Sequence, residues 1–183
     1  MHRKSYSIIL AAAFLAVFMI AGIHSVGSQD MPFGSTGDVE FANKTWTALK
    51  DYRSWKLKSD YYDGQAPHGS VVRTYYGNVA VDGKSYHVIL KENYGGEEIT
   101  IEKVAKEPDK FLGAVTVMVQ REEGYDKDNN NWFWIKFNPK GKVMTNPKGM
   151  SLAGRVAKGM DKGCISCHGD AKGNDYLYIN DKK

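Results

Sequence analysis

The middle of the chain alternates between apolar and polar residues, which is the pattern of strands with one buried face. Val71–Val81 is rich in Val, Thr and Tyr, and Ser85–Glu92 continues in the same way. Between them, Asp82-Gly83 is a strong signal for a tight hairpin turn. Gly113–Arg121 and Trp132–Phe137 predict two further strands joined by a polar turn. The pattern therefore predicts an antiparallel sheet.

Helical spacing is confined to short parts of the chain. Apolar residues three or four positions apart follow Asp38, which predicts a helix with Asp38 as its N-cap and an end near Arg53. Ile99–Ala105 fits either a strand or a helix, and Met150–Lys158 predicts a short helix. A four-helix bundle needs four long helical stretches, and this chain supplies one or two. Helical bundle proteins are therefore excluded.

The first residues have the pattern of an export signal. Arg3 and Lys4 form a basic start before the uncharged apolar run Ile8–Ile23, and small residues suited to cleavage follow. Export indicates an oxidising compartment, the periplasm, while an uncleaved membrane anchor is the alternative. We expect three segments: a signal peptide at residues 1–27, a Gly/Ser-rich leader at residues 28–37 and one domain at residues 38–183.

Charge and cysteine content narrow the possible functions. The formal net charge of +4 comes from dispersed Lys and Arg residues without a basic run, so binding to nucleic acid is not expected. The chain has 2 cysteines. Both belong to one short motif, so no cysteine remains for a structural disulfide.

That motif is Cys164-Ile165-Ser166-Cys167-His168, a CxxCH sequence of the kind that attaches c-type haem. In such a motif Cys164 and Cys167 bond to the haem vinyl groups, and His168 is the iron ligand. A thioredoxin-like pair would follow a strand in a βαβ unit, and a zinc site would need a second Cys or His pair nearby. The chain has neither, so one covalently bound haem c is the predicted cofactor.

The predicted fold class is α+β: mainly antiparallel β-sheet, with an N-terminal helix and a C-terminal haem-binding loop or helix. No His or Met follows His168. A second axial ligand must therefore come from upstream, or that side of the iron is open.

Several short pieces, taken in their order and spacing, resemble the cytochrome P-460 and cytochrome c′-β family. They are Tyr52-Arg53-Ser54-Trp55, Ala66-Pro67-His68-Gly69, Val72-Arg73-Thr74-Tyr75, Val88-Ile89-Leu90-Lys91-Glu92, Met118-Val119-Gln120-Arg121, Gly124-Tyr125, Trp132-Phe133, Cys164–His168 and Asp175-Tyr176. The resemblance implies a dimeric β-sheet protein whose haem iron is bound by the CxxCH histidine and open on the other side. One branch of the family oxidises hydroxylamine with a haem that carries a lysine cross-link. The other branch binds nitric oxide and similar diatomics in an apolar pocket.

Two positions distinguish the branches. By the resemblance, Lys91 corresponds to the cross-linking lysine, and strand alternation places it on the same face as Ile89. The alternative is that Lys91 is a solvated charge at a strand end. The enzymatic branch also keeps a carboxylate over the iron, at a position near Thr116, where this strand is uncharged. The group that would move protons is therefore missing, which favours diatomic binding.

Other residues have a structural as well as a functional interpretation. We expect His68 to lie in a turn or on the surface, although it could also ligate iron or lie near the haem propionates, and His87 to be partly buried on a strand. Met118 and Met144 can supply a thioether ligand but more often fill core gaps. Arg73 can pair with a propionate or with a surface carboxylate. Only one of the sets Trp132/Trp134 and Phe133/Phe137 can face the haem.

Three functions remain. The first is a periplasmic monohaem cytochrome with an open site that binds small nitrogen oxides or other diatomics. The second is an oxidoreductase that acts on hydroxylamine or nitric oxide, with Lys91 cross-linked to haem. The third is a simple electron carrier. We expect a homodimer and a partner cytochrome for electron exchange.

Overall fold

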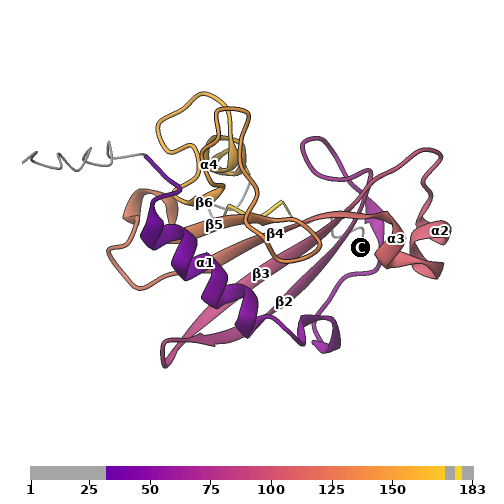
Figure 1. The fold of residues 1–183 in the computed structure, drawn as a ribbon, viewed down its shortest axis with the longest axis horizontal. Helices are drawn as coiled ribbons and strands as arrows, with labels where there is room; N and C mark the ends of the chain where they lie inside the picture. The colour runs from indigo at the N-terminus through magenta and orange to yellow at the C-terminus, as the bar shows by residue number, and fades with distance from the viewer. Residues whose placement is uncertain (1–31, 172–175, 179–183) are drawn as a thin grey trace, which may run out of the picture.

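Among residues 32–171 and 176–178, which the computed structural model describes, six strands form one antiparallel sheet in sequence order (Figure 1). They are β1 (Tyr62–Asp63), β2 (Val71–Val81), β3 (Lys84–Tyr94), β4 (Leu112–Gln120), β5 (Trp132–Phe137) and β6 (Ala153–Gly154). The predicted bounds of β2 and β5 are confirmed, and those of β3 and β4 differ by one or two residues. The predicted α+β fold class is confirmed.

The turn between β2 and β3 has the predicted conformation. Asp82 and Gly83 have φ values of 50° and 77°. Two successive left-handed residues form the turn whose twist matches that of an antiparallel hairpin. This turn fixes the register of the longest strand pair, which runs from Val81 opposite Lys84 to Val71 opposite Tyr94.

Helix α1 (Thr36–Ala48) begins and ends earlier than predicted. Its N-cap is Ser35, not Asp38: the Ser35 hydroxyl accepts from the Asp38 N–H at 3.1 Å, and the Asp38 carboxylate accepts from the Ser35 N–H at 3.1 Å. This reciprocal capping box places Asp38 three residues inside the helix. At the other end the chain turns into the 3₁₀ helix η1 (Tyr52–Ser54), so Arg53 lies outside α1.

The two faces of the sheet bury different side chains. On one face, Val88 and Leu90 of β3 pack in a core cluster with Ala42 of α1. On the other face, Ile89 packs with Val156 and other residues of the C-terminal segment. The predicted alternation along β3 is confirmed, and it separates an α1 side from a C-terminal side of the sheet.

One of the two predictions for short helices is confirmed and the other is wrong. Ile101–Lys106 is helix α2, so the helical alternative for this region is right. The other short helices are α3 (Pro108–Phe111), η2 (Lys127–Asn129) and α4 (Cys164–Gly169). The predicted helix at Met150–Lys158 is wrong, because this segment forms β6 and turns. Gly154 has a φ of 97°, outside the helical region, and pairs with Trp134 of β5.

The N-terminal expectations are tested only in part. The predicted signal peptide and the first residues of the predicted leader lie outside the described residues. The described end of the predicted leader packs on the domain: Phe33 is 3% exposed, and the Gly34 N–H donates to the Ala153 carbonyl at 2.8 Å. Within residues 32–171 and 176–178, no helix has the length and apolar character needed to cross a membrane.

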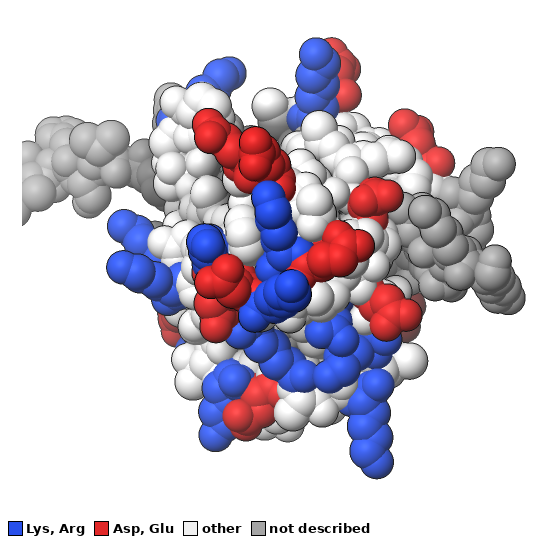
Figure 2. Space-filling view, turned by 90° about the vertical axis from the view of Figure 1, so that its right-hand side faces the viewer, with Lys and Arg blue, Asp and Glu red and all other residues white. Residues whose placement is uncertain are grey.

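On the face drawn in Figure 2, acidic and basic side chains are interspersed.

A buried carboxylate joins η1 to the sheet. Glu92 of β3 is 0% exposed. The hydroxyls of Tyr52, Tyr75 and Tyr94 donate to it at 2.6, 2.7 and 2.6 Å, and Arg53 Nε donates at 2.7 Å. Burial, together with the bonds to Glu92, raises the pKa of all three tyrosines, so they remain protonated donors. Every oxygen of this carboxylate is therefore satisfied despite its burial.

Candidate functional site

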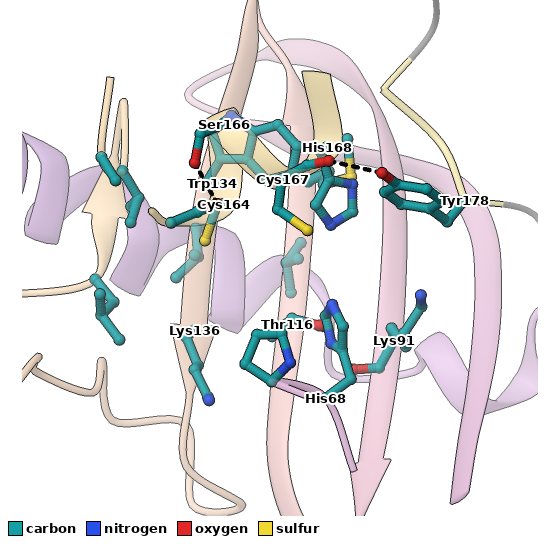
Figure 3. Close-up of a pocket in the computed structure, with 18 of the residues that line it drawn as sticks. His68, Lys91, Thr116, Trp134, Lys136, Cys164, Ser166, Cys167, His168 and Tyr178 are labelled. Atoms are coloured by element: carbon teal, nitrogen blue, oxygen red, sulfur yellow. Dashed lines mark hydrogen bonds between the residues drawn. The ribbon is translucent and has the colours of Figure 1, made fainter. Parts of the chain in front are cut away.

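A pocket of about 610 Å³ lies between the C-terminal segment and the sheet face that is turned away from α1 (Figure 3). Strand register arranges its sheet wall as two rows of four residues across β2, β3, β4 and β5. The polar row is Thr74, Lys91, Thr116 and Lys136. A second row lies two residues away from the first along each strand and is apolar. It consists of Tyr76, Ile89, Met118 and Trp134.

The alternation predicted for β5 is confirmed. Trp132 and Trp134 lie on the pocket side of the sheet, and Trp134 lines the pocket. Phe133 and Phe137 lie on the opposite side, in the core cluster under α1. The set that faces the candidate site is therefore the pair of tryptophans.

The CxxCH motif forms α4 and borders the pocket. Cys164, Cys167 and His168 all line it, and Ile165 is buried against the sheet. Gly163 starts the helix with a φ of 147°, and a Cβ there would collide with the Ala157 methyl group, so only glycine fits. Burial raises the pKa of the Cys164 thiol to about 11, which keeps it protonated at neutral pH.

His168 is held in one tautomer. Its Nδ1 lies 2.7 Å from the carbonyl oxygen of Tyr176. A carbonyl can only accept, so Nδ1 carries the proton and Nε2 keeps a lone pair. Burial lowers the pKa of this imidazole further than the carbonyl raises it, so the ring is neutral at neutral pH. Tyr176 is itself fixed, because its hydroxyl donates to the Asp128 carbonyl at 2.9 Å.

The expected turn or surface position of His68 is only half right. The residue lies in the loop between β1 and β2, but its side chain is half-buried and lines the pocket. Its Nδ1 is 2.7 Å from Oδ1 of Asn93. Burial, followed by the charge of Lys91, lowers the pKa of His68 to about 4. A neutral imidazole from this loop therefore faces the CxxCH segment.

Lys91 is not the solvated charge of the alternative interpretation. Its side chain is half-buried and lines the pocket, and burial lowers the pKa of its ammonium group. Among the described residues it forms no ion pair, and the same holds for Lys136 in the polar row. A lowered pKa increases the fraction of neutral amine, which is the nucleophilic form.

The remaining candidates divide between the pocket and the surface. Thr116 and Met118 line the pocket, whereas Met144 is not one of its lining residues. His87 is exposed rather than partly buried, with its ring beside Trp132. Arg73 neither lines the pocket nor pairs with a carboxylate among the described residues: its Nε donates to the Ser59 carbonyl at 3.1 Å.

The structure agrees with the prediction that β4 carries no charged residue around Thr116, although Lys91 of β3 and Lys136 of β5 lie on either side of it. Among the described residues, the carboxylates that line the pocket are Asp161 and Asp170. Both are exposed and both belong to the C-terminal segment, not to the sheet wall. A proton-transferring carboxylate is therefore missing from β4.

Sequence reasoning missed several residues of the site. Asn93 and Lys136 were predictable, because each follows a pocket residue of its strand by two positions and so lies on the same face. Tyr178 carries no such signal, and Tyr176 was identified only as part of the resemblance, in the piece Asp175-Tyr176. The ring of Tyr178 contacts that of His168 edge to face, with 5.6 Å between ring centres, and its hydroxyl donates to the Cys167 carbonyl at 2.8 Å.

The residues present fit a haem bound through the CxxCH motif. Nε2 of His168 offers a lone pair, both cysteines border a largely apolar pocket, and Nε1 of Trp134 is a buried donor without a partner among the described residues. A group with an acceptor atom in the pocket would satisfy that donor. A zinc site fits less well, because the described residues hold no cluster of three or more His, Cys, Asp or Glu side chains.

Comparison with known proteins agrees with this description. A family model named Cytochrome P460 matches residues 49–179, a range that spans all six strands, the pocket and the CxxCH motif. No curated protein and no solved structure matches the chain. On the extent of the family match, the chain belongs to the cytochrome P460 family, which implies that it binds haem.

Proposed function

We propose that this protein is a monohaem c-type cytochrome that binds small neutral ligands, such as nitric oxide, on the side of the haem opposite His168. Cys164 and Cys167 would hold the haem covalently, and His168 would bind its iron through Nε2. The observation that carries the proposal is the bond from His168 Nδ1 to the Tyr176 carbonyl, which fixes the tautomer that an iron ligand needs. Haem in this position supplies an iron that binds diatomics and exchanges single electrons.

The absence of a carboxylate from β4 supports a ligand that binds without proton transfer. Ile89 and Met118 give the sheet wall an apolar surface, and Thr116 is the uncharged neighbour of Lys91. Hydroxylamine oxidation needs a base that accepts protons, and β4 offers none. Nitric oxide binding needs no proton transfer.

Nitric oxide titration tests this function. On adding nitric oxide to the reduced holoprotein, we expect a change in the visible spectrum that saturates at one ligand per haem. Replacement of His168 by Ala should alter the spectrum before any ligand is added, because the proximal ligand is lost. A wild-type spectrum that stays unchanged after long incubation with excess nitric oxide would contradict the proposal.

A second candidate is the oxidoreductase with a lysine–haem cross-link, and the buried position of Lys91 favours it. Bonding Nζ to a porphyrin carbon removes one hydrogen from each, so a peroxide would have to act as the two-electron oxidant. If this occurs, mass spectrometry of the proteolysed holoprotein should find haem joined to a Lys91 peptide as well as to the CxxCH peptide. Lys91→Arg should abolish the third bond, while Lys136→Arg, in the same row, should preserve it. Haem bonded to the CxxCH peptide alone rules out this candidate.

We also propose export to the periplasm, a homodimeric state and electron exchange with a partner cytochrome. The basic and apolar pattern of residues 3–23 supports export. Mass measurement of the mature protein after fractionation of the cell tests the first point, since cleavage after Gly27 removes a defined mass. Light scattering of the holoprotein tests the second.

A further inference from the structure

His68 and His168 lie opposite one another across the pocket. Figure 3 shows their rings turned toward each other, with Lys91 and Lys136 on either side of His68. Their ring centres are 6.1 Å apart, and the ring planes make an angle of 78°. The two residues come from distant parts of the chain, the loop before β2 and the end of α4.

This separation agrees with two ligands on opposite sides of one metal ion. A metal–imidazole nitrogen bond is about 2.0 Å long, and the ring centre lies about 1.1 Å behind the nitrogen, so two such rings have centres about 6.2 Å apart. Edge-to-face packing of two aromatic rings produces distances in the same range. The distance therefore agrees with both arrangements. The hydrogen bonds of the two rings show in addition which nitrogen of each carries a lone pair.

The hydrogen bonds of Asn93 fix the tautomer of His68. Nδ2 of Asn93 donates to the Lys91 carbonyl at 2.8 Å and to Thr116 Oγ1 at 3.2 Å. Its Oδ1 therefore faces His68 and can only accept, so Nδ1 of His68 carries the proton. This leaves Nε2 of His68 as the nitrogen with a lone pair.

Both histidines thus have a protonated Nδ1 held by an oxygen acceptor and an Nε2 with a free lone pair. Each donates from Nδ1 to an oxygen at 2.7 Å, one to Tyr176 and the other to Asn93. A ligating histidine is typically oriented by a hydrogen bond from its second ring nitrogen in this way. The bond to Asn93 also satisfies a buried N–H group, and its further effect is to leave Nε2 of His68 without a proton.

We propose that His68 is the second axial ligand of the haem iron in the resting protein, and that an incoming diatomic must displace it. This inference rests on the proposed function, because it requires haem attached at α4 and bound by His168. It deepens that function by adding a gate: the site opens only when the loop residue His68 moves away. Pro67 and its neighbours Gln65 and Ala66 are exposed, so this loop is not enclosed by other parts of the protein.

Spectroscopy of the oxidised holoprotein tests the assignment. We expect a six-coordinate low-spin spectrum for the wild type and a high-spin spectrum for His68→Ala, with added imidazole restoring the low-spin form. His87→Ala is the matched control, since His87 is exposed and lies outside the pocket lining, and it should stay low-spin. A high-spin wild type, or a His68→Ala spectrum identical to that of the wild type, would overturn the proposal.

Ligand binding provides a second readout. Nitric oxide should bind His68→Ala about tenfold faster or more, because only the fraction of wild-type protein with His68 displaced is competent to bind. Equal rates for the two proteins contradict the gate. Failure of the proposed function looks different: haem would be absent from α4, or His168→Ala would leave the spectrum unchanged. This inference fails while the proposed function stands if haem is attached and the His168→Ala spectrum is altered, but the His68→Ala spectrum equals that of the wild type.

Discussion

Glu92→Ala is expected to lower the free energy of unfolding by about 3–5 kcal/mol, because each buried donor left unpaired costs roughly 1–3 kcal/mol. The side chain is 0% exposed, and the substitution would leave three tyrosine hydroxyls and Arg53 without their shared acceptor. Urea denaturation followed by tryptophan fluorescence measures the loss. Tyr75→Phe removes only one of the donors and should cost about 1 kcal/mol.

The control is a carboxylate in an exposed pair. Glu107 and Lys110 have side chains that are both 62% exposed, so Glu107→Ala should cost less than about 1 kcal/mol. If Glu92→Ala does not fold, Glu92→Gln, which keeps an acceptor oxygen, should give a folded and less destabilised protein. A loss for Glu92→Ala as small as that for Glu107→Ala would contradict a structural role for this cluster.

Replacing both Cys164 and Cys167 by Ala is expected to abolish covalent haem attachment completely. The two thiols are the only cysteines of the chain, so no other residue can form the thioethers. Haem staining after denaturing electrophoresis, combined with the mass of the intact protein, reports attachment directly. Each single substitution should leave one bond and a haem that still survives denaturation.

Ser166→Ala is the matched control for the cysteine variants. Ser166 lies between the two cysteines, and its hydroxyl donates to the Gly163 carbonyl at 3.2 Å. This variant keeps both thiols and should keep covalent haem. Covalent haem in the double cysteine variant would show that attachment occurs elsewhere, and the CxxCH assignment would then be wrong.

Local sequence signals predicted the strands well. Alternation identified β2 and β5 at both ends, and the Asp82-Gly83 pair identified the hairpin turn. The same rule placed Lys91 and Ile89 on one face and Val88 and Leu90 on the other. These features depend on neighbouring residues, which is why sequence alone reveals them.

Other features depend on residues that are far apart in the chain. Alternation places Glu92 with Val88 and Leu90 on the core side, but the Tyr52 and Arg53 groups that satisfy it lie about 40 residues earlier. His68 was expected in a turn or on the surface because its loop has no periodicity, and only the folded structure brings it to Asn93 and His168. The N-cap of α1 was missed for a simpler reason: Asp38 is itself a good cap, and Ser35 was the better one.

Within each of the strands β3, β4 and β5, odd-numbered and even-numbered residues lie on opposite faces of the sheet. In β3 the odd-numbered residues 89 and 91 shape the pocket while the even-numbered residues 88, 90 and 92 build the core; in β4 and β5 the assignment is reversed. A slip of one residue between β3 and β4 would bring Glu92 into the pocket and Lys91 into the core. While the register holds, a substitution such as Thr116→Glu changes the chemistry offered to a ligand without touching a core side chain. Substitutions in the polar row can therefore alter ligand preference while the core under α1 keeps its side chains.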